Sequence, residues 1–196
     1  MEKLEVYEKI KEAWESILHE LQMLGLNLDD PNFHGTPERI AKMLVYEKCA
    51  GLNSKEKCKE LLGKRFPTEY DGMVVLNPIK VWSMCAHHWV DVVYQVFMGY
   101  IPKNKEVIGI SKIPRVIKLF ASQPTIQEQF TKDLTDLFIE SIDPEGIGLI
   151  VRGQHNCMVA RGIQQPDVWI TTSEMRGTFR INPSLKEEFL LLCGLK

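Results

Sequence analysis

The strand-like segments of this 196-residue chain come in adjacent pairs, and that order constrains the fold more than any other feature. From Met73 onward apolar residues tend to recur at every second position, whereas before it they recur at every third or fourth. Residues 73–84 and 89–102 form one pair of β-rich runs, and residues 147–163 and 168–179 form another. Strands that follow each other without an intervening helix pair antiparallel. We therefore expect an α+β domain with a largely antiparallel sheet.

Helical periodicity marks the segments before, between and after these strand pairs. We expect helices over residues 2–24, 36 to about 49, 54–62, 112–121, 126–142 and 182–195. Thr36 is a candidate N-cap, with Pro37 at the first helical position. The predicted order is helices, ββ, αα, ββ and a final helix. Such a sheet has open edges, and self-association that joins them is one way to cover them.

Composition and charge exclude several classes of protein. The net charge of −2 indicates neither nucleic acid nor an anionic membrane as a partner. No apolar run approaches the roughly 20 residues that span a bilayer, and the first residues lack the apolar region of a signal peptide. Five cysteines at irregular spacing fit no disulfide framework. We therefore expect a cytoplasmic protein with an N-terminal helical region over residues 1–66 and a strand-bearing domain over residues 67–196.

Residues that can bind a metal gather in two short segments. SMCAHHWV carries Cys85, His87 and His88, and QHNCM carries His155 and Cys157. Residues two apart on a strand point to the same face, so His155 and Cys157 can face one site. Thiolate and imidazole ligands favour zinc over magnesium or calcium. No second C-x-x-C or C-x-x-H pair exists to close a structural site, so we favour an open zinc site with three protein ligands, Cys85, His88 and Cys157.

Under this interpretation His87 and His155 stay off the metal and are free for proton transfer. Spacing alone leaves open which imidazoles bind the metal. Buried unliganded cysteines and core histidines are the competing interpretation. The gathering of three of the five histidines and two of the five cysteines in two segments favours the metal.

Several longer motifs stand in the order and approximate spacing of GTP cyclohydrolase I. They are SMCAHH, GYIP, VIGISKIPR, QPTIQEQFT, QHNCMVARG and TTSEMRGTFR, together with TPERIAKM in the second helix. The resemblance runs from about Thr36 to Phe189. It implies the tunnelling fold, ββααββ, in a homodecamer of two stacked pentamers. It also implies a catalytic zinc held by Cys85, His88 and Cys157.

The resemblance implies an activity and a set of roles. The family opens the imidazole ring of GTP, releases C8 as formate and recloses the skeleton as 7,8-dihydroneopterin triphosphate. By resemblance, His155 donates a proton to the purine and His87 assists proton transfer, while Ser111 acts on the ribose. Glu128 matches the residue that recognises the guanine, with Gln127 beside it; a carboxylate suits the N1–H and 2-amino group because it offers two aligned oxygens.

The triphosphate requires several cations, and the resemblance supplies candidates for them. Lys112 and Arg115 lie three apart at the start of a helix, so they share a face near its positive end. Arg161 follows the second metal-binding segment. Arg39 matches an arginine that reaches into a neighbouring subunit's pocket. Arg176 also matches a family motif, and we assign it a structural role.

The sequence departs from its family at several positions. Ala86 stands where the family usually has Glu, and Asp91 stands where many members have Pro. Phe97 replaces a common histidine or other aromatic residue, and Ser122 and Gln123 replace two arginines found in many members. None of these is a proposed ligand or proton donor. They leave open whether the substrate is GTP or a related guanine nucleotide.

Two alternatives to the complete reaction remain. An enzyme of the same fold could stop after opening the ring, which loss of a ribose-handling residue would favour; Ser111 is present and argues against it. A purine- or pterin-binding protein with a structural metal, or none, is the other alternative. Ala86 is the feature that favours it, whereas the retained cysteines, histidines and Glu128 favour catalysis.

Overall fold

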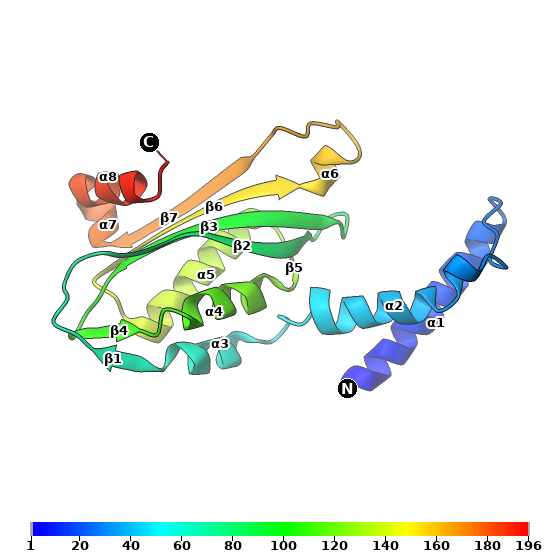
Figure 1. Ribbon diagram of the computed structural model, residues 1–196, viewed down its shortest axis with the longest axis horizontal. Coiled ribbons are helices and arrows are strands. Elements are labelled where there is room, and N and C mark those ends of the chain that lie inside the picture. Colours follow the sequence, from blue (N-terminus) through cyan, green and yellow to red (C-terminus); the bar gives the residue numbers. More distant parts are fainter. Residues whose placement is uncertain (1, 196) are drawn as a thin grey trace. The chain divides into compact units, whose positions relative to one another are not determined.

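The chain is represented by a computed structural model that describes residues 2–195 (Figure 1). It divides after Ala50 into two compact units, which are described separately. The second unit therefore starts earlier than the boundary expected between residues 66 and 67. The cause is helix α3 (Lys55–Leu62), whose Cys58 and Leu62 are fully buried in the main core of the second unit.

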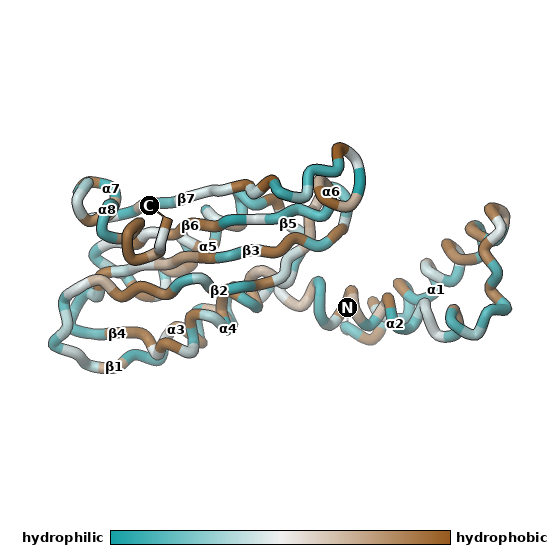
Figure 2. Tube along the Cα trace, turned by 45° about the horizontal axis from the view of Figure 1, so that its top comes forward, coloured by the Kyte–Doolittle hydropathy of each residue, from teal (hydrophilic) through white to brown (hydrophobic). Residues whose placement is uncertain are grey.

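The first unit consists of helical segments. They are α1 (Lys3–Gln22), the 3-10 turn η1 (Pro31–Phe33), α2 (Thr36–Met43) and the π-helical turn η2 (Leu44–Lys48). Hydrophobic and hydrophilic residues alternate along α1, as an amphipathic helix requires (Figure 2). Leu18, Ala41 and Val45 are buried, and Lys11 forms an ion pair with Glu38 at 3.2 Å.

The start of α2 differs from the prediction. Thr36 is the first helical residue, and Gly35 with a φ of 71° occupies the N-cap position. A left-handed conformation suits glycine because it has no Cβ. The Thr36 hydroxyl instead accepts a hydrogen bond from Nη2 of Arg39 at 2.8 Å.

The second unit is built on one mixed sheet with the strand order β5-β2-β3-β6-β7. The strands are β2 (Val74–Cys85), β3 (Asp91–Ile101), β5 (Pro124–Thr125), β6 (Gly146–His155) and β7 (Ile170–Gly177). The pairs β2–β3, β3–β6 and β6–β7 are antiparallel, and β5 adds a short parallel edge to β2. Separately, β1 (Arg65–Pro67) pairs with β4 (Glu106–Ile108). The predicted α+β fold with the order ββααββ is confirmed.

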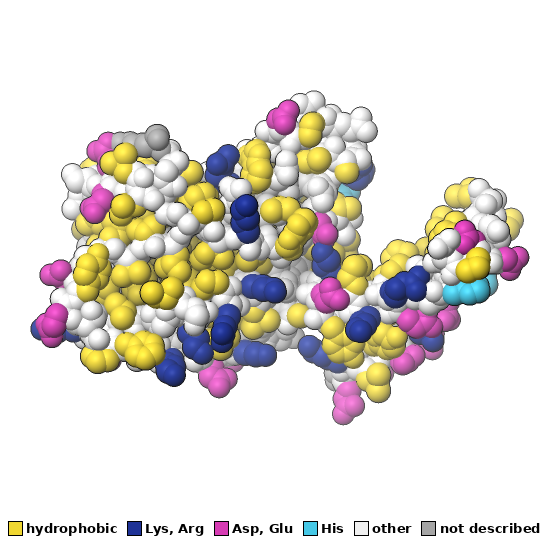
Figure 3. Space-filling view, in the orientation of Figure 1, with side chains coloured by type: hydrophobic (Ala, Val, Ile, Leu, Met, Phe, Trp, Pro, Cys, Tyr) yellow, Lys and Arg dark blue, Asp and Glu magenta, His cyan; other side chains and the backbone are white. Residues whose placement is uncertain are grey.

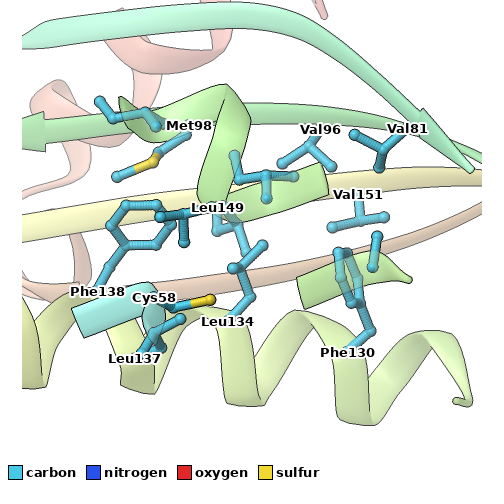
Figure 4. Close-up of a cluster of buried hydrophobic side chains, with 14 of the residues drawn as sticks. Cys58, Val81, Val96, Met98, Phe130, Leu134, Leu137, Phe138, Leu149 and Val151 are labelled. Carbon is cyan, nitrogen blue, oxygen red and sulfur yellow. The ribbon is translucent and has the colours of Figure 1, made fainter. Parts of the chain in front are cut away.

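Helices α4 (Lys112–Ala121) and α5 (Gln127–Ile142) cover one face of the sheet (Figure 1). From α5, Phe130, Leu134 and Phe138 point toward strand residues such as Met98 and Val151 (Figure 4). Each of these side chains is at most 2% exposed. Burying a side chain of this size contributes roughly 1.5–3 kcal/mol, so this layer fixes α5 firmly against the strands.

The opposite face is covered at one end by α7 (Thr178–Ile181) and α8 (Pro183–Leu192). Phe179 and Phe189 meet edge to face with ring centroids 5.5 Å apart, and Phe97 packs in the same cluster. Phe97 is thus a core residue of this second cluster. Within residues 2–195, no helix is long and apolar enough to cross a membrane.

Candidate functional site

The site forms where β2 and β6 end on either side of β3. Met84 pairs with Asp91, and Val92 pairs with His155, so Cys85 and His155 come to the same end of the sheet. A turn over residues 86–90 joins β2 to β3. It is closed by hydrogen bonds between the backbones of Cys85 and Val90 at 2.9 Å, and of Trp89 and Cys85 at 2.9 Å.

Cys157 reaches the site by a different route from the one predicted. Strand β6 ends at His155, and residues Asn156–Val159 form the short helix α6, so the two residues do not share a strand face. Strand pairing ends here on both sides of β6. Strand β7 pairs with β6 only as far as Gly153, and β3 pairs with β6 only as far as His155. The helical turn nevertheless carries the Cys157 thiol back toward Cys85.

Cys85, His155 and Cys157 form a group with metal-binding geometry. Their potential ligand atoms all lie within 4.8 Å of one another. A tetrahedral zinc with Zn–S bonds of about 2.3 Å holds its sulfur ligands roughly 3.8 Å apart, so the group is close to the required spacing. Cys85 is 4% exposed and His155 is 9% exposed, which keeps the group largely out of water. The donor set therefore fits zinc.

His87 and His88 lie in the exposed turn that follows Cys85. Their ring centroids are 6.4 Å apart and nearly perpendicular. His88, predicted to be the third ligand, lies outside the group of three within the described residues, whereas His155 lies inside it. The structure thus brings together both predicted cysteine ligands and one of the two predicted proton donors.

Burial dominates the electrostatics of this group. It raises the pKa of the Cys157 thiol, and the neighbouring Cys85 raises that pKa further, while Arg161 opposes the shift. Burial also lowers the pKa of His155, with Glu128 acting in the opposite direction. The Cys157 thiol therefore resists ionisation in this setting, and a cation bound there would favour its thiolate.

Gln127 and Glu128 are brought to the site by β5. Thr125 pairs with Cys85, and the Ala86 backbone N–H donates to the Thr125 carbonyl at 3.2 Å, which places the first turn of α5 beside the group. Glu128 is exposed, as a substrate-binding residue should be. Gln127 is only 2% exposed, and its Oε1 lies 2.9 Å from Nε2 of His155.

Ser111, Lys112 and Arg115 lie at the other end of α4. The C-terminal end of this ten-residue helix leads into β5 beside Cys85, so its N-terminal end is about 15 Å away along the axis. Ser111 and Arg115 are exposed, and Lys112 is half-buried. Lys and Arg side chains gather over α3 and α4 (Figure 3). Within one chain these residues do not join the cysteine–histidine group.

Tyr94 is a residue near the site that the sequence did not single out. Its side chain is fully buried, and its hydroxyl has no hydrogen-bond partner among the described residues. The ring stacks on Phe130 with centroids 4.9 Å apart and meets His155 edge-on at 6.2 Å. Burial raises the pKa of the Tyr94 phenol, and the nearby Ser83 hydroxyl opposes that shift. Its place in a run of alternating apolar residues predicts only a core residue. Its proximity to the site is evident only from its contact with His155 in the fold.

Comparison with known proteins shows to which family the chain belongs. The family model described as GTP cyclohydrolase I matches residues 10–194. The chain belongs to the GTP cyclohydrolase I family. It is 36% identical over 187 residues to GTP cyclohydrolase 1 of Desulforamulus reducens, covering 94% of this chain and 95% of that one.

Two further relatives carry the same name. GTP cyclohydrolase 1 of Clostridium perfringens is 35% identical over 191 residues, covering 96% of this chain and 98% of the relative. GTP cyclohydrolase 1 of Drosophila melanogaster is 38% identical over 173 residues, 88% of this chain. The match spans about half, 52%, of that longer protein.

The remaining arginines expected from the GTP cyclohydrolase I family have separate settings. Arg161 is exposed and follows α6. Arg39 belongs to the first unit, where its guanidinium donates to two carbonyls of the preceding loop and to the Thr36 hydroxyl. Arg176 on β7 is half-buried and pairs with Glu174. That ion pair is consistent with the structural role assigned to Arg176.

Apart from Phe97, which lies in the second core cluster, the departures from the GTP cyclohydrolase I pattern lie at the edge of the site. Ala86 has an exposed side chain, and its backbone holds β5. Ser122 and Gln123 finish α4: the Ser122 hydroxyl donates to the Lys118 carbonyl at 2.9 Å, and the Gln123 amide donates to the Phe120 carbonyl at 2.8 Å. Asp91 is half-buried at the first position of β3. Ala86, Ser122 and Gln123 thus make contacts with the local backbone, and none of them belongs to the cysteine–histidine group.

Proposed function

We propose that this chain is a zinc-dependent GTP cyclohydrolase I. It adds water to C8 of the GTP imidazole ring, releases formate and rearranges the remainder to 7,8-dihydroneopterin triphosphate. The observation that carries the proposal is the approach of Cys85, Cys157 and His155 to one another in a chain of this family. Because a purine C8 is a poor electrophile, the reaction needs both an activated water and a proton donor.

The metal ligands we propose are Cys85, His88 and Cys157. Soft thiolates with an imidazole select zinc, and three protein ligands leave one position open. A zinc held by these residues would supply an activated water, since it would bring the pKa of that water toward neutrality. His155 is the proposed proton donor to N7 of the purine, which makes C8 more electrophilic, and His87 assists proton transfer from its place in the neighbouring turn.

Substrate recognition is proposed to involve the start of α5 and a set of cations. The Glu128 carboxylate accepts hydrogen bonds from the guanine N1–H and 2-amino group. Gln127, by contrast, is buried with its amide engaged, which supports an indirect role. Ser111 acts on the ribose. The triphosphate is bound by Lys112, Arg115 and Arg161, and by Arg39 of a neighbouring copy of the chain.

Self-association completes this proposed site. Since Ser111, Lys112 and Arg115 lie at the far end of α4 from Cys85, we propose that a second copy of the chain supplies them. A homodecamer of two pentamers, the assembly implied by the family, provides such neighbours. We place the enzyme in the cytoplasm, where a reducing environment keeps cysteines such as Cys85 and Cys157 free.

The decisive experiment follows two products in one assay. The purified, zinc-loaded protein is incubated with GTP, and formate release is measured together with the pterin absorbance and, after oxidation, the pterin fluorescence. Both signals are expected. Formate without a pterin signal would show that the ring opens and does not reclose. Neither signal with stoichiometric zinc would contradict GTP as the substrate, and other guanine nucleotides would then be tried.

A further inference from the structure

The hydrogen bond between Gln127 and His155 indicates which nitrogen of the imidazole is protonated. Oε1 of Gln127 lies 2.9 Å from Nε2 of His155, and both side chains are at least nine-tenths buried. A neutral imidazole carries one proton, on either Nδ1 or Nε2. Whichever end of the Gln127 amide faces His155 decides which nitrogen is protonated.

The other contacts of Gln127 fix the orientation of its amide. Its Nε2 lies 3.0 Å from the carbonyl oxygens of Val151 and Ile170 and 3.2 Å from the Thr172 hydroxyl. Carbonyl oxygens only accept hydrogen bonds, so the NH₂ group must face them. A flipped amide would place its own oxygen against two carbonyls. The amide oxygen therefore faces His155.

The surroundings hold this amide still. The backbone carbonyl of Gln127 accepts a hydrogen bond from the Thr131 hydroxyl at 2.8 Å, and that hydroxyl lies 2.6 Å from the Thr172 hydroxyl, which also contacts the Gln127 amide nitrogen. The network thus joins α5 to β6 and β7. A fully connected buried network of this kind keeps one geometry because every alternative leaves a polar group unpaired.

We propose that Gln127 is a positioning residue that sets the tautomer of His155. Its Oε1 accepts the Nε2–H of His155, which leaves Nδ1 with the free lone pair. Resting on the proposed function, this means that Nδ1 is the atom that takes up a proton from solvent, giving the imidazolium, and then passes that proton to N7 of the purine, while Nε2 keeps its own. Gln127 then acts through His155 and does not touch the guanine, unlike Glu128.

The tautomer can be tested on the unmodified protein without any activity measurement. Neutron diffraction from deuterated crystals, grown at a pH where His155 is neutral, locates the ring deuteron. A deuteron on Nε2 and a bare Nδ1 are expected. A deuteron on Nδ1 alone would overturn the proposal. Because substrate is absent, this result is independent of whether the protein is a GTP cyclohydrolase.

Steady-state kinetics then distinguish a role of Gln127 in positioning His155 from a role in binding the substrate. Gln127→Met keeps the length of the side chain and removes its hydrogen bonds; formate release should fall roughly 10- to 100-fold in kcat, as when the partner that orients a functional histidine is lost. KM for GTP should change less than about 2-fold, because the substrate contacts remain. A raised KM with unchanged kcat would overturn the proposal in favour of substrate contact.

Gln129→Met is the matched control. Gln129 stands two positions away on the exposed side of α5, where its amide donates to Asp133 at 2.6 Å. The same substitution there should leave kcat and KM as in the unmodified protein. Equal losses in both variants would assign the effect to α5 stability and contradict a role for the His155 contact. If Gln127→Met does not fold, the position of the deuteron on His155 in the unmodified protein still tests the proposed tautomer.

Discussion

Gly153 and Tyr94 are directly paired across β3 and β6, and the absence of a side chain at Gly153 creates the space that Tyr94 and Gln127 occupy. A Cβ at position 153 would lie 3.0 Å from Cε1 of Tyr94 and 2.1 Å from Oε1 of Gln127. That oxygen is the one that faces His155. One glycine therefore permits both the aromatic packing and the amide contact beside the site.

The first prediction concerns this glycine. Gly153→Ala should displace the Gln127 amide, because the three acceptors around its nitrogen prevent a small adjustment. We expect a loss of roughly 1–3 kcal/mol in the free energy of unfolding, the usual cost of overpacking. Formate release should fall as well. Urea denaturation and the formate assay measure the two effects.

A suitable control for this change is Gly63→Ala. Gly63 lies at the end of α3, and a Cβ there would come no closer than 3.3 Å to a backbone carbonyl. Its effect on unfolding should be smaller, and activity should be retained. If Gly153→Ala were as mild as Gly63→Ala in both measurements, the close packing around Gln127 would be contradicted.

The second prediction concerns the hydroxyl of Tyr94. Among the described residues it has no hydrogen bond of standard geometry, and the Ser83 hydroxyl that lowers its pKa also donates to the Gln123 carbonyl, so Tyr94→Phe should leave the free energy of unfolding unchanged or raise it by up to about 1 kcal/mol. Tyr100→Phe is the matched control, since the Tyr100 hydroxyl accepts a hydrogen bond from the Ile108 N–H at 3.3 Å. That change should cost about 0.5–1.5 kcal/mol. A larger loss at Tyr94 than at Tyr100 would indicate a partner for the Tyr94 hydroxyl.

Local periodicity was sufficient to predict the longer elements. Helix α4 has the predicted bounds, and α5 starts one residue later than predicted. The two-residue strand β5 and the four-residue helix α6 were missed because segments this short contain no repeating pattern. The start of the second unit depends on α3, which buries its apolar side in the large core, and sequence periodicity does not specify the partner of a helix.

The candidate site was predictable in its residue types and only partly in its geometry. Cys85 and Cys157 do approach each other, although α6 rather than a shared strand brings Cys157 there. Gln127 was predicted to bind substrate, but its burial depends on contacts with β6 and β7 that are distant in sequence. In the absence of other information, a polar side chain is expected to contact solvent or substrate. A buried amide that orients a histidine has no signature in sequence spacing.

The third prediction concerns alkaline stability. Burial raises the pKa of the Cys193 thiol from 9.0 to about 11, and Cys193 is only 7% exposed. A folded-state pKa above the unfolded value contributes stability below the unfolded pKa, and this contribution is lost as the pH rises through the folded pKa. The neutral thiol should therefore favour folding below about pH 9, with up to roughly 2–3 kcal/mol lost as the pH approaches 11.

Cys193→Ala isolates this contribution. The free energy of unfolding, measured in urea from pH 8 upward, should fall less steeply in the variant than in the unmodified protein. Cys49 and Cys58 also have pKa values raised by burial, and they remain in both proteins. The difference between the two curves therefore belongs to Cys193. Parallel curves would show that Cys193 ionises as easily in the folded state as in the unfolded state.

The fourth prediction separates metal ligands from proton donors. Cys157→Ser and His88→Ser should both lose zinc and activity, since each removes a proposed ligand. His155→Ser should keep zinc and lose ring opening. Zinc per chain is measured by elemental analysis and formate release by the assay above. If His155→Ser strips the metal while His88→Ser retains it, then the compact group of Cys85, His155 and Cys157 is the ligand set.

The fifth prediction tests whether two copies of the chain build one site. His155 lies at the cysteine end of the sheet, and Lys112 lies at the far end of α4, so a complete site should take them from different chains. His155→Ser and Lys112→Ala should each be inactive alone. Co-expressed in equal amounts, they should form mixed assemblies in which roughly a quarter of the sites have both residues intact.

Formate release by the co-expressed variants, compared with the unmodified protein, measures that recovery. Mixing the two proteins after separate purification is the control, because subunits that do not exchange give no mixed sites. If His155 and Lys112 acted within one chain, every site in the mixed assembly would lack one of them. No activity would then return, even when tagged copies of both variants are recovered together, and the proposal that a second copy completes the site would be contradicted.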